Sequence, residues 1–397
     1  MKSSLRKLFT VLAAGSLLSL FLTSSATAAA LDDGYPEGAA APGRTCSADA
    51  VGQKELSSHS GKNLSCILIY GIAKWWIDGD PLPAVETPAA KPTASAGPAP
   101  SAGPTAPASA GNQFVLDKGV KITLKKGSKL IKVGDARPAQ VLIPGTLKSK
   151  VAAPLLVALP GFTATPNDLL ALVDLTAEAY KRGVVLALPS GSKNSGGLPF
   201  WNATGSCCDF EKSGVDDSKY LMDLVKQISA KVSIDAKRVY FFGHSNGGFM
   251  SYTTACNNSS KIAALVNFNG SSFADMSLCK ADRPVSVLQI NGTEDELIHI
   301  AGGDVFDDPK QPYPSVAVET SKWAEINGCS TSAALIKNKT KFNYESVLAG
   351  SETTKAAYKC PKGVAVEMWT IAGGKHLPKI NAAFISSVFD FLLAHKK

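Results

Sequence analysis

Long apolar runs alternate with segments of helical periodicity through most of this 397-residue chain. The runs lack the polar alternation of half-exposed strands, so we expect strands that are buried on both faces. Runs occur at residues 154–161, 184–191, 238–243, 262–270, 284–292 and 364–373, and helical segments at 168–183, 215–232 and 380–394. This alternation predicts an α/β fold with a mostly parallel central sheet and helices on both faces. Segments 119–127 and 139–145 are interpreted as antiparallel edge strands.

The N-terminal residues 1–30 have the pattern of a secretory signal peptide. Lys2, Arg6 and Lys7 precede an apolar run that ends in the small residues "ATAAA". We therefore expect a secreted, extracellular protein. No later apolar run reaches the roughly 18 residues that are needed to cross a bilayer, so no membrane partner is expected.

Composition divides the rest of the chain into three parts. Residues 84–112 are almost entirely Ala, Pro, Ser, Gly and Thr, which is typical of an extended linker between a small module at 31–83 and a large domain at 113–397. A bridge between Cys46 and Cys66 would stabilise the small module by about 2 to 4 kcal/mol. Its tryptophan pair, Trp75 and Trp76, has two interpretations, an aromatic platform for an insoluble polymer or the module's own core, and the second is favoured.

Charge and cysteine content exclude several classes of function. The net charge of +8 includes the three basic residues of the signal peptide, and the remaining excess is spread along the chain, so no nucleic-acid partner is expected. The eight cysteines of an exported chain indicate disulfides, and they lack the paired short spacings of zinc ligands, so no metal is expected.

Cys207 and Cys208 are adjacent, with Cα atoms about 3.8 Å apart, and we expect them to bond to different partners.

A serine in the stretch "RVYFFGHSNGGFMSY" is the strongest catalytic signal. Gly243, Ser245 and Gly247 form a G-x-S-x-G pattern between a predicted strand and a predicted helix. This is the context of a nucleophile elbow, where small residues two positions on either side allow a turn sharp enough to expose the serine hydroxyl. The pattern lacks the lysine of a phosphate-binding loop and the spacing of a dinucleotide fingerprint.

The order of residues along the chain selects the partners of this serine. In hydrolases with such an elbow the serine is followed by an acid and then by a histidine. Of the five histidines, His376 in the glycine-rich loop "AGGKH" after a strand is the predicted general base. Asp295, after the strand "VLQING", is the predicted acid that orients it. Both are therefore predicted to join Ser245 in the active site.

Two backbone N–H groups are predicted to stabilise the oxyanion of an acyl-transfer reaction. One belongs to Asn246, directly after the serine, and the other to Phe162, in the loop after the strand "PLLVALPG". Such donors contribute roughly 3 to 4 kcal/mol each in comparable sites. No step of this chemistry requires a cofactor.

With these motifs in place, the large domain resembles the secreted polyhydroxybutyrate depolymerase and feruloyl esterase C family of α/β-hydrolases. The resemblance covers roughly residues 120–397, through "FWNATGSCC", "SIDAKRVYFFGHSNGGFMSY", "PVSVLQINGTEDELI", "WAEINGC" and "AGGKH". It implies an α/β-hydrolase fold with the same three catalytic residues. It also implies a Cys329–Cys360 bridge and a disulfide frame that combines Cys207 and Cys208 with Cys256 and Cys279.

The resemblance also places Trp201 and Asn202 in the wall of the substrate cleft. The Trp201 ring has two interpretations of equal weight, a surface that stacks on a feruloyl ring or a buried support for the disulfide loops. The chain departs from the family pattern at Pro160, Asn291 and Leu377, all of which flank the predicted cleft. These departures leave the catalytic residues in place and bear on substrate choice.

The resulting hypothesis is a monomeric, secreted serine esterase that acts on an insoluble polymeric ester. A feruloyl esterase acting on plant cell-wall polysaccharide is favoured, because the chain shows no binding domain after the catalytic one. The alternative is an extracellular poly(3-hydroxybutyrate) depolymerase. A third hypothesis, a non-catalytic surface-binding protein on a hydrolase fold, is disfavoured by the complete set of catalytic residue types.

Overall fold

The computed structural model of this protein describes 11 segments of the chain: residues 53–56, 63–69, 72–77, 113–115, 121–123, 125–135, 137–147, 151–305, 309–331, 335–338 and 340–397. They belong to two compact units, divided between residues 91 and 92, and each unit is considered by itself. The predicted signal peptide, the predicted linker and Cys46 lie outside the described residues.

The first unit contains a small antiparallel sheet in the order β1-β2-β3, formed by Lys54–Leu56, Asn63–Ile69 and Ile72–Ile77. Trp75 and Trp76 lie on β3, where they pair with Cys66 and Ser65 of β2. The predicted module therefore contains a sheet. Its role stays a prediction.

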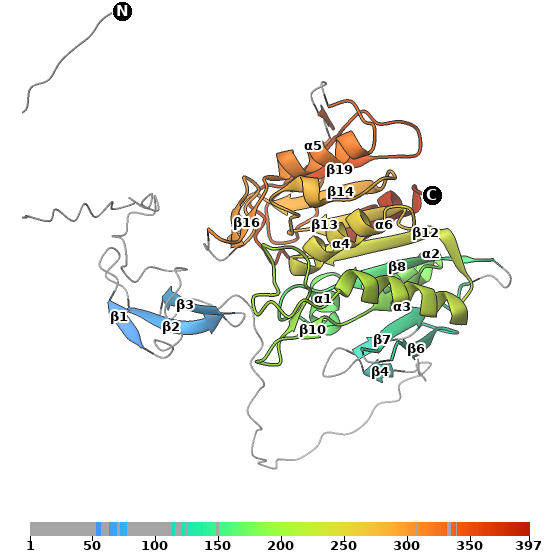
Figure 1. Ribbon diagram of the computed structural model, residues 1–397, viewed down its shortest axis with the longest axis horizontal. Helices are drawn as coiled ribbons and strands as arrows, with labels where there is room; N and C mark the ends of the chain where they lie inside the picture. Colours follow the sequence, from blue (N-terminus) through green and yellow to red (C-terminus); the bar gives the residue numbers. More distant parts are fainter. Residues whose placement is uncertain are drawn as a thin grey trace, which may run out of the picture. The chain divides into compact units, whose positions relative to one another are not determined.

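The second unit is built on a ten-stranded sheet in the order β17-β18-β19-β14-β13-β12-β8-β9-β7-β6 (Figure 1). Its parallel strands are β8 Ala153–Leu159, β9 Val185–Leu188, β12 Ile234–His244, β13 Ala264–Phe268, β14 Ser286–Gly292 and β19 Val366–Ile371. These are the six predicted strands. Antiparallel strands flank them, namely β6 Lys129–Val133, β7 Ala139–Ile143, β17 Ile336–Lys337 and β18 Thr353–Ala357.

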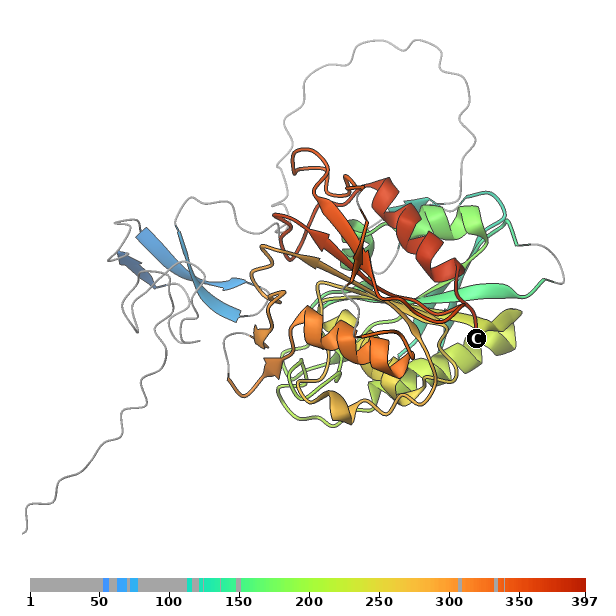
Figure 2. The same cartoon turned by 90° about the horizontal axis from the view of Figure 1, so that it is seen from above.

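Helices cover both faces of this sheet, as predicted. The helices are α1 Pro166–Leu172, α2 Thr176–Arg182, α3 Asp217–Lys231, α4 Asn246–Asn257, α5 Val316–Ile326 and α6 Ala382–Leu393. Along β8, Leu155 and Val157 pack with α3, α4 and α5, whereas Leu156 and Ala158 pack with α1, α2 and α6. Figure 2 shows α6 and α5 on opposite faces of the sheet. The two faces of one apolar run thus serve two separate cores.

Two predicted elements differ from the observed ones. The segment 168–183 was expected as one helix, but the chain forms α1 and α2, because Val173 is extended and Asp174 accepts a hydrogen bond from the Thr176 backbone at 2.9 Å. The expected edge strand at 119–127 contributes only β5, which pairs with β4 in a separate two-stranded sheet. The edge of the main sheet is instead β6.

Short elements complete the second unit. They are β4 Gln113–Val115 with β5 Lys121–Thr123, β10 Ser192–Lys193 with β11 Pro199–Phe200, β15 Gly303–Asp304 with β16 Pro312–Tyr313, and a 3₁₀ turn at Met276–Leu278. The pair β10 and β11 lies between the end of β9 and α3, and the pair β15 and β16 lies between the end of β14 and α5. They therefore build the edge of the sheet where α/β proteins bind their ligands.

The disulfides correct one prediction from the sequence. Cys329 bonds to Cys360, as the resemblance implied, and Cys256 bonds to Cys279. Cys207 and Cys208, however, bond to each other rather than to different partners. The expectation assumed a trans peptide with the usual Cα spacing, whereas the peptide between these two residues is cis and their Cα atoms lie 3.0 Å apart.

Candidate active site

Ser245 lies at the turn from β12 into α4, in the middle of the ten-stranded sheet. Its φ of 54° and ψ of −125° form a backbone conformation that residues with side chains rarely adopt. The flanking glycines allow it, because a Cβ at Gly243 would collide with the Gly247 carbonyl and a Cβ at Gly247 would collide with the Leu159 carbonyl. The turn is the strained strand-to-helix geometry of a nucleophile elbow.

His376 and Asp295 are in direct contact at the same end of the sheet. His376 Nδ1 lies 3.0 and 2.9 Å from the two carboxylate oxygens of Asp295. Asp295 Oδ1 also accepts hydrogen bonds from the backbone N–H groups of Leu297 and Ile298, at 2.9 and 2.8 Å. Because both side chains are buried, with exposed fractions of 5% and 0%, this pair is fixed in one orientation. With Nδ1 directed at the carboxylate, Nε2 is the ring nitrogen left to exchange a proton with a substrate or nucleophile.

The surroundings raise the pKa of His376 above its ordinary value. Burial alone lowers it, but the charge and hydrogen bond of Asp295 outweigh burial, and Glu296 adds a smaller contribution. The ring is thus a stronger base than an exposed imidazole. This property suits a group that must accept a proton during the reaction.

Two residues that the sequence did not mark as functional hold the backbone of His376. His244 Nε2 donates to the His376 carbonyl at 2.9 Å, and Asn269 Nδ2 donates to the same oxygen at 3.0 Å. Burial, with a smaller effect of the His376 charge, lowers the pKa of His244 to about 3, so its ring stays neutral. Asn269 Oδ1 also accepts a hydrogen bond from the Gly292 N–H at 3.0 Å, and Asn269 thereby links the loop of His376 to the end of β14.

The predicted oxyanion donors lie around Ser245. Asn246 is the first residue of α4, where a backbone N–H has no acceptor within the helix. The loop of Phe162 approaches from β8, because a Cβ on Gly161 would lie 3.2 Å from Ser245 Cβ and 3.6 Å from its Oγ. The structure thus brings both predicted segments to the serine, and their roles in stabilising an oxyanion stay predictions.

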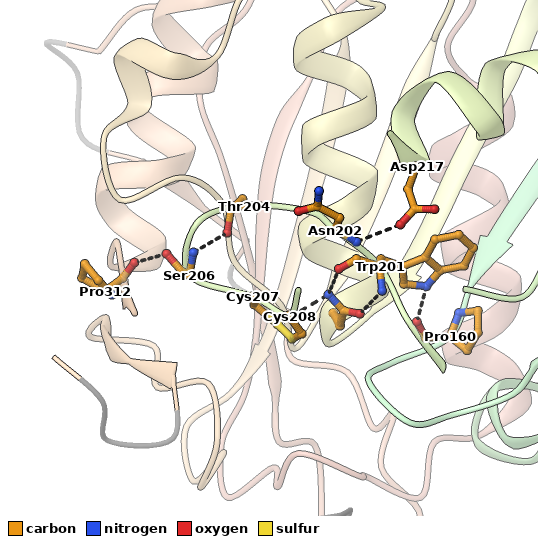
Figure 3. Close-up of a disulfide and its surroundings, with 10 residues drawn as sticks. Pro160, Trp201, Asn202, Thr204, Ser206, Cys207, Cys208, Asp217 and Pro312 are labelled. Atoms are coloured by element: carbon orange, nitrogen blue, oxygen red, sulfur yellow. Dashed lines mark hydrogen bonds between the residues drawn. A yellow bond between two sulfur atoms is a disulfide. The ribbon is translucent and has the colours of Figure 1, made fainter. Parts of the chain in front are cut away.

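Trp201 is a buried residue. Its side chain is 1% exposed, and its indole N–H donates to the Pro160 carbonyl at 2.9 Å (Figure 3). The Asn246 side chain accepts from the Trp201 N–H at 2.8 Å and donates to the Trp201 carbonyl at 3.0 Å. The burial of the ring favours the interpretation as a support for the disulfide loops, and contact of Trp201 with substrate stays a prediction.

Asn202 is half-buried and lines a cavity. Its backbone N–H donates to Asp217 Oδ2 at 2.8 Å, and its Nδ2 donates to the Val215 carbonyl at 2.9 Å. Figure 3 shows Asn202 beside Asp217 at the start of α3. Its predicted contact with substrate stays a prediction.

A second buried acid lies behind the elbow. Glu319 of α5 is 0% exposed, and its Oε2 accepts from the Ser271 hydroxyl at 3.0 Å. Burial raises the pKa of Glu319 to about 8, although the nearby side chains of Tyr252, Ser271 and Asn267 oppose the effect in part. The Tyr252 hydroxyl donates to Gln289 Oε1 at 2.8 Å. These side chains are linked to the elbow through Gly270, whose carbonyl accepts from Gln289 Nε2 at 3.1 Å and where an added Cβ would lie 2.6 Å from the Ser245 carbonyl oxygen.

Among the described residues, no group of three or more His, Cys, Asp or Glu side chains is arranged to hold a metal ion. The same residues include no helix with the length and apolar character of a membrane span.

Comparison with known proteins agrees with this geometry. Residues 188–310, which contain the elbow and Asp295, match the family described as phospholipase/carboxylesterase. Together with the mostly parallel sheet and the elbow on its middle strand, this match decides the fold. The chain is an α/β-hydrolase by fold.

This α/β-hydrolase is similar to several fungal esterases, and its resemblance to ester-cleaving members of the fold is confirmed. It is 28% identical over 245 residues to feruloyl esterase B of Piromyces equi, a match covering 60% of this chain and 42% of that protein. It is 26% identical over 259 residues to the bifunctional acetylxylan esterase/xylanase XynS20E of Neocallimastix patriciarum, covering 65% and 33%. The match therefore spans less than half the length of either relative.

Among solved structures, it is similar to an acetyl xylan esterase from Aspergillus awamori. The identity is 16% and the TM-score 0.49, over 66% of this chain and 99% of that one.

Proposed function

We propose that this chain is a secreted serine carboxylic ester hydrolase, a feruloyl esterase that acts on plant cell-wall polysaccharide. The observation that carries the proposal is the buried contact of His376 Nδ1 with Asp295, at the end of the sheet where Ser245 forms a nucleophile elbow. The names of the two fungal relatives support an ester of a plant polysaccharide as substrate. The disulfides among the described residues support an oxidising, extracellular location.

The reaction follows from the orientation of these groups. His376 Nε2 accepts the proton of Ser245 Oγ as that oxygen attacks the ester carbonyl carbon, and the N–H groups of Asn246 and Phe162 hold the oxyanion. The intermediate collapses when His376 gives the proton to the leaving alcohol oxygen, which leaves an acyl-enzyme on Ser245. Water then attacks the acyl group with His376 as base, and return of the proton to Ser245 Oγ releases the acid. Throughout, Asp295 keeps the ring in the Nδ1–H tautomer and stabilises its cationic form.

The test is a release assay with the purified protein on methyl ferulate, feruloylated arabinoxylan and poly(3-hydroxybutyrate) film. We expect release of ferulate from the first two and no erosion of the film. Ser245→Ala should lower the rate at least about 10⁴-fold, because the nucleophile is lost. Hydroxybutyrate release without ferulate release would make the protein a polyester depolymerase. Unchanged ester hydrolysis in Ser245→Ala would contradict the assignment of the nucleophile.

A further inference from the structure

A cavity of about 640 Å³ lies beside the proposed active site. It is bounded by the loop that carries Asn202 and Phe210, by the second half of α4, and by Phe273 and Gln311 from the loops that follow β13 and β15. Its volume is within the range of small-molecule binding sites. The reaction scheme above uses none of these side chains directly.

Two contacts connect the cavity to the reacting atoms. The Phe210 ring, which is 40% exposed, packs edge to face on the Phe162 ring with centroids 5.5 Å apart. Phe162 follows Gly161, where an added Cβ would lie 3.2 Å from Ser245 Cβ. On the other side, Cys207 lines the cavity and its Sγ lies 3.5 Å from Asn246 Nδ2. A single side chain, Phe210 or Cys207, therefore separates a ligand in the cavity from Phe162 and Asn246, the two residues whose N–H groups are proposed to hold the oxyanion.

The cavity also extends away from the serine along α4. Thr253 lines it, and this residue lies eight positions after Ser245, which corresponds to about 12 Å along a helix. That distance exceeds the size of the ester group that reacts at Ser245. The cavity is thus placed to hold a part of the substrate remote from the reacting bond.

The lining contains Lys212 as well as three carboxylates that already have partners, so its charges of both signs do not single out an ionic ligand. Asp209 accepts hydrogen bonds from Ser213 and from the Gly214 N–H. Asp216 caps α3 through the Lys219 N–H at 2.8 Å, and Asp217 pairs with Arg137 at 2.6 Å. Arg137 therefore compensates the charge of Asp217, and oxygens of Asp209 and Asp216 are already used as acceptors within the protein.

The remaining lining combines polar groups with aromatic rings. Asn202 and Thr253, whose donors bond to the Val215 and Ala203 carbonyls, contribute acceptor oxygens. Asn257 contributes an amide group, and Phe210 and Phe273 contribute apolar rings. Sugars present hydroxyl groups at their edges and C–H groups on their faces, so they need both kinds of contact. A preformed cavity with this mixture fits a carbohydrate better than a wholly apolar ligand.

We propose that this cavity binds sugar units of the polysaccharide chain that carries the scissile ester. The proposal rests on the proposed function and adds a subsite to it. Binding energy gained there, remote from the reacting bond, would position the ester carbonyl at Ser245. A polymeric substrate would gain this energy, and a small ester such as methyl ferulate would not.

The experiment measures binding without turnover. Ester-free arabinoxylan oligosaccharides are titrated calorimetrically into the full chain carrying Ser245→Ala, and the wild-type chain is assayed separately on methyl ferulate. We expect saturable binding that Phe210→Ala weakens about 3- to 10-fold, because an aromatic contact is lost. Asn257→Trp, at an exposed position on the last turn of α4, should block the cavity and abolish binding. Ile336→Ala removes an exposed apolar side chain from β17, outside the lining, and should leave the affinity unchanged.

The outcomes separate the two proposals. If methyl ferulate is cleaved but no oligosaccharide binds, or if neither lining variant changes the affinity, the subsite is wrong and the proposed function stands. If methyl ferulate is not cleaved while oligosaccharide binding persists and is lost in Asn257→Trp, the feruloyl esterase proposal fails and the cavity stands as a carbohydrate site. Circular dichroism of each variant verifies that it is folded.

Discussion

Two buried carboxyl groups, Asp295 and Glu319, lie near Ser245 and differ in what surrounds them. Asp295 contacts a histidine ring and two backbone N–H groups, and its charge raises the pKa of that ring. Glu319 Oε2 accepts a hydrogen bond from the Ser271 hydroxyl, and within the described residues Glu319 Oε1 has no hydrogen-bond partner. Burial therefore raises the pKa of Glu319 to about 8, and the acid is neutral at pH 7.

Asp295 and Glu319 are both buried but differ in their partners, so burial alone does not make an acid catalytic. The partner of Asp295 exchanges a proton during the proposed reaction, so the charge of this acid is used in every turnover. Glu319 has no basic partner among its described contacts, and we interpret it as a neutral packing and hydrogen-bonding group beneath the elbow.

The largest effect is expected from Asp295→Asn. The amide cannot provide two acceptor oxygens to His376, so the ring is no longer held in the Nδ1–H tautomer. We expect kcat on methyl ferulate to fall about 10³- to 10⁴-fold. Glu294→Gln is a matched control at an exposed neighbour whose side chain pairs with Lys375, and it should keep wild-type kcat. Equal activity of Asp295→Asn and this control would contradict the role of Asp295.

The pH profile gives the next largest effect. His376 acts as a base only when neutral, and its pKa is raised, so kcat/KM should fall about tenfold per pH unit below a midpoint above 6.5. In Asp295→Asn the midpoint of the residual activity should move to lower pH, because the carboxylate charge that raises it is gone. A profile that is flat between pH 5 and 8 would count against a histidine base.

Glu319→Gln should change stability rather than chemistry. The folded protein holds a proton on Glu319 up to about pH 8, whereas the unfolded chain releases it near 4.5, so the free energy of unfolding falls as pH rises between these values. In this window the unfolding constant should rise by up to about tenfold per pH unit from this group alone. Urea unfolding of both proteins across pH 5 to 8 measures the difference. We expect a shallower dependence in Glu319→Gln, and identical slopes would show that Glu319 is already ionised in the folded state.

Tyr252→Phe should have the smallest effect. It removes the hydroxyl that donates to Gln289 and leaves the ring stacked on Trp323, with centroids 5.6 Å apart. We expect a loss of about 1 kcal/mol in the free energy of unfolding. Thermal unfolding at pH 7, with kcat on methyl ferulate measured in parallel, tests this. A loss of kcat comparable to that of Asp295→Asn would place this group in the catalytic machinery and break the comparison.

The fold was predictable because the local pattern determines it. Six apolar runs buried on both faces became six parallel strands, and the glycines around Ser245 marked the strand-to-helix turn. The contact of Asp295 with His376 followed from chain order, since both residues lie in the loops that follow adjacent strands of the sheet.

Other features depend on contacts between distant segments, which the sequence does not display. His244 and Asn269 hold the His376 carbonyl from positions 132 and 107 residues away. The buried indole N–H of Trp201 donates to the carbonyl of Pro160, which lies 41 residues away in the sequence. Nothing in the residue types distinguishes these residues from ordinary core residues. The approach of Asn269 to the loop of His376 has one local signal, an Asn-Gly pair directly after β13.

The position of Ser245 has a consequence for how this protein would lose the proposed activity. Its amide donates to the Phe268 carbonyl at 2.9 Å, and its strand β12 lies between β8 and β13 in the middle of the sheet. Hydrogen bonds at such a place open only when the whole domain unfolds, so the amide should be among the slowest in the chain to exchange with solvent. Fraying of the edge strands would leave the serine in place. Thermal inactivation should accordingly follow the cooperative unfolding of the domain instead of preceding it.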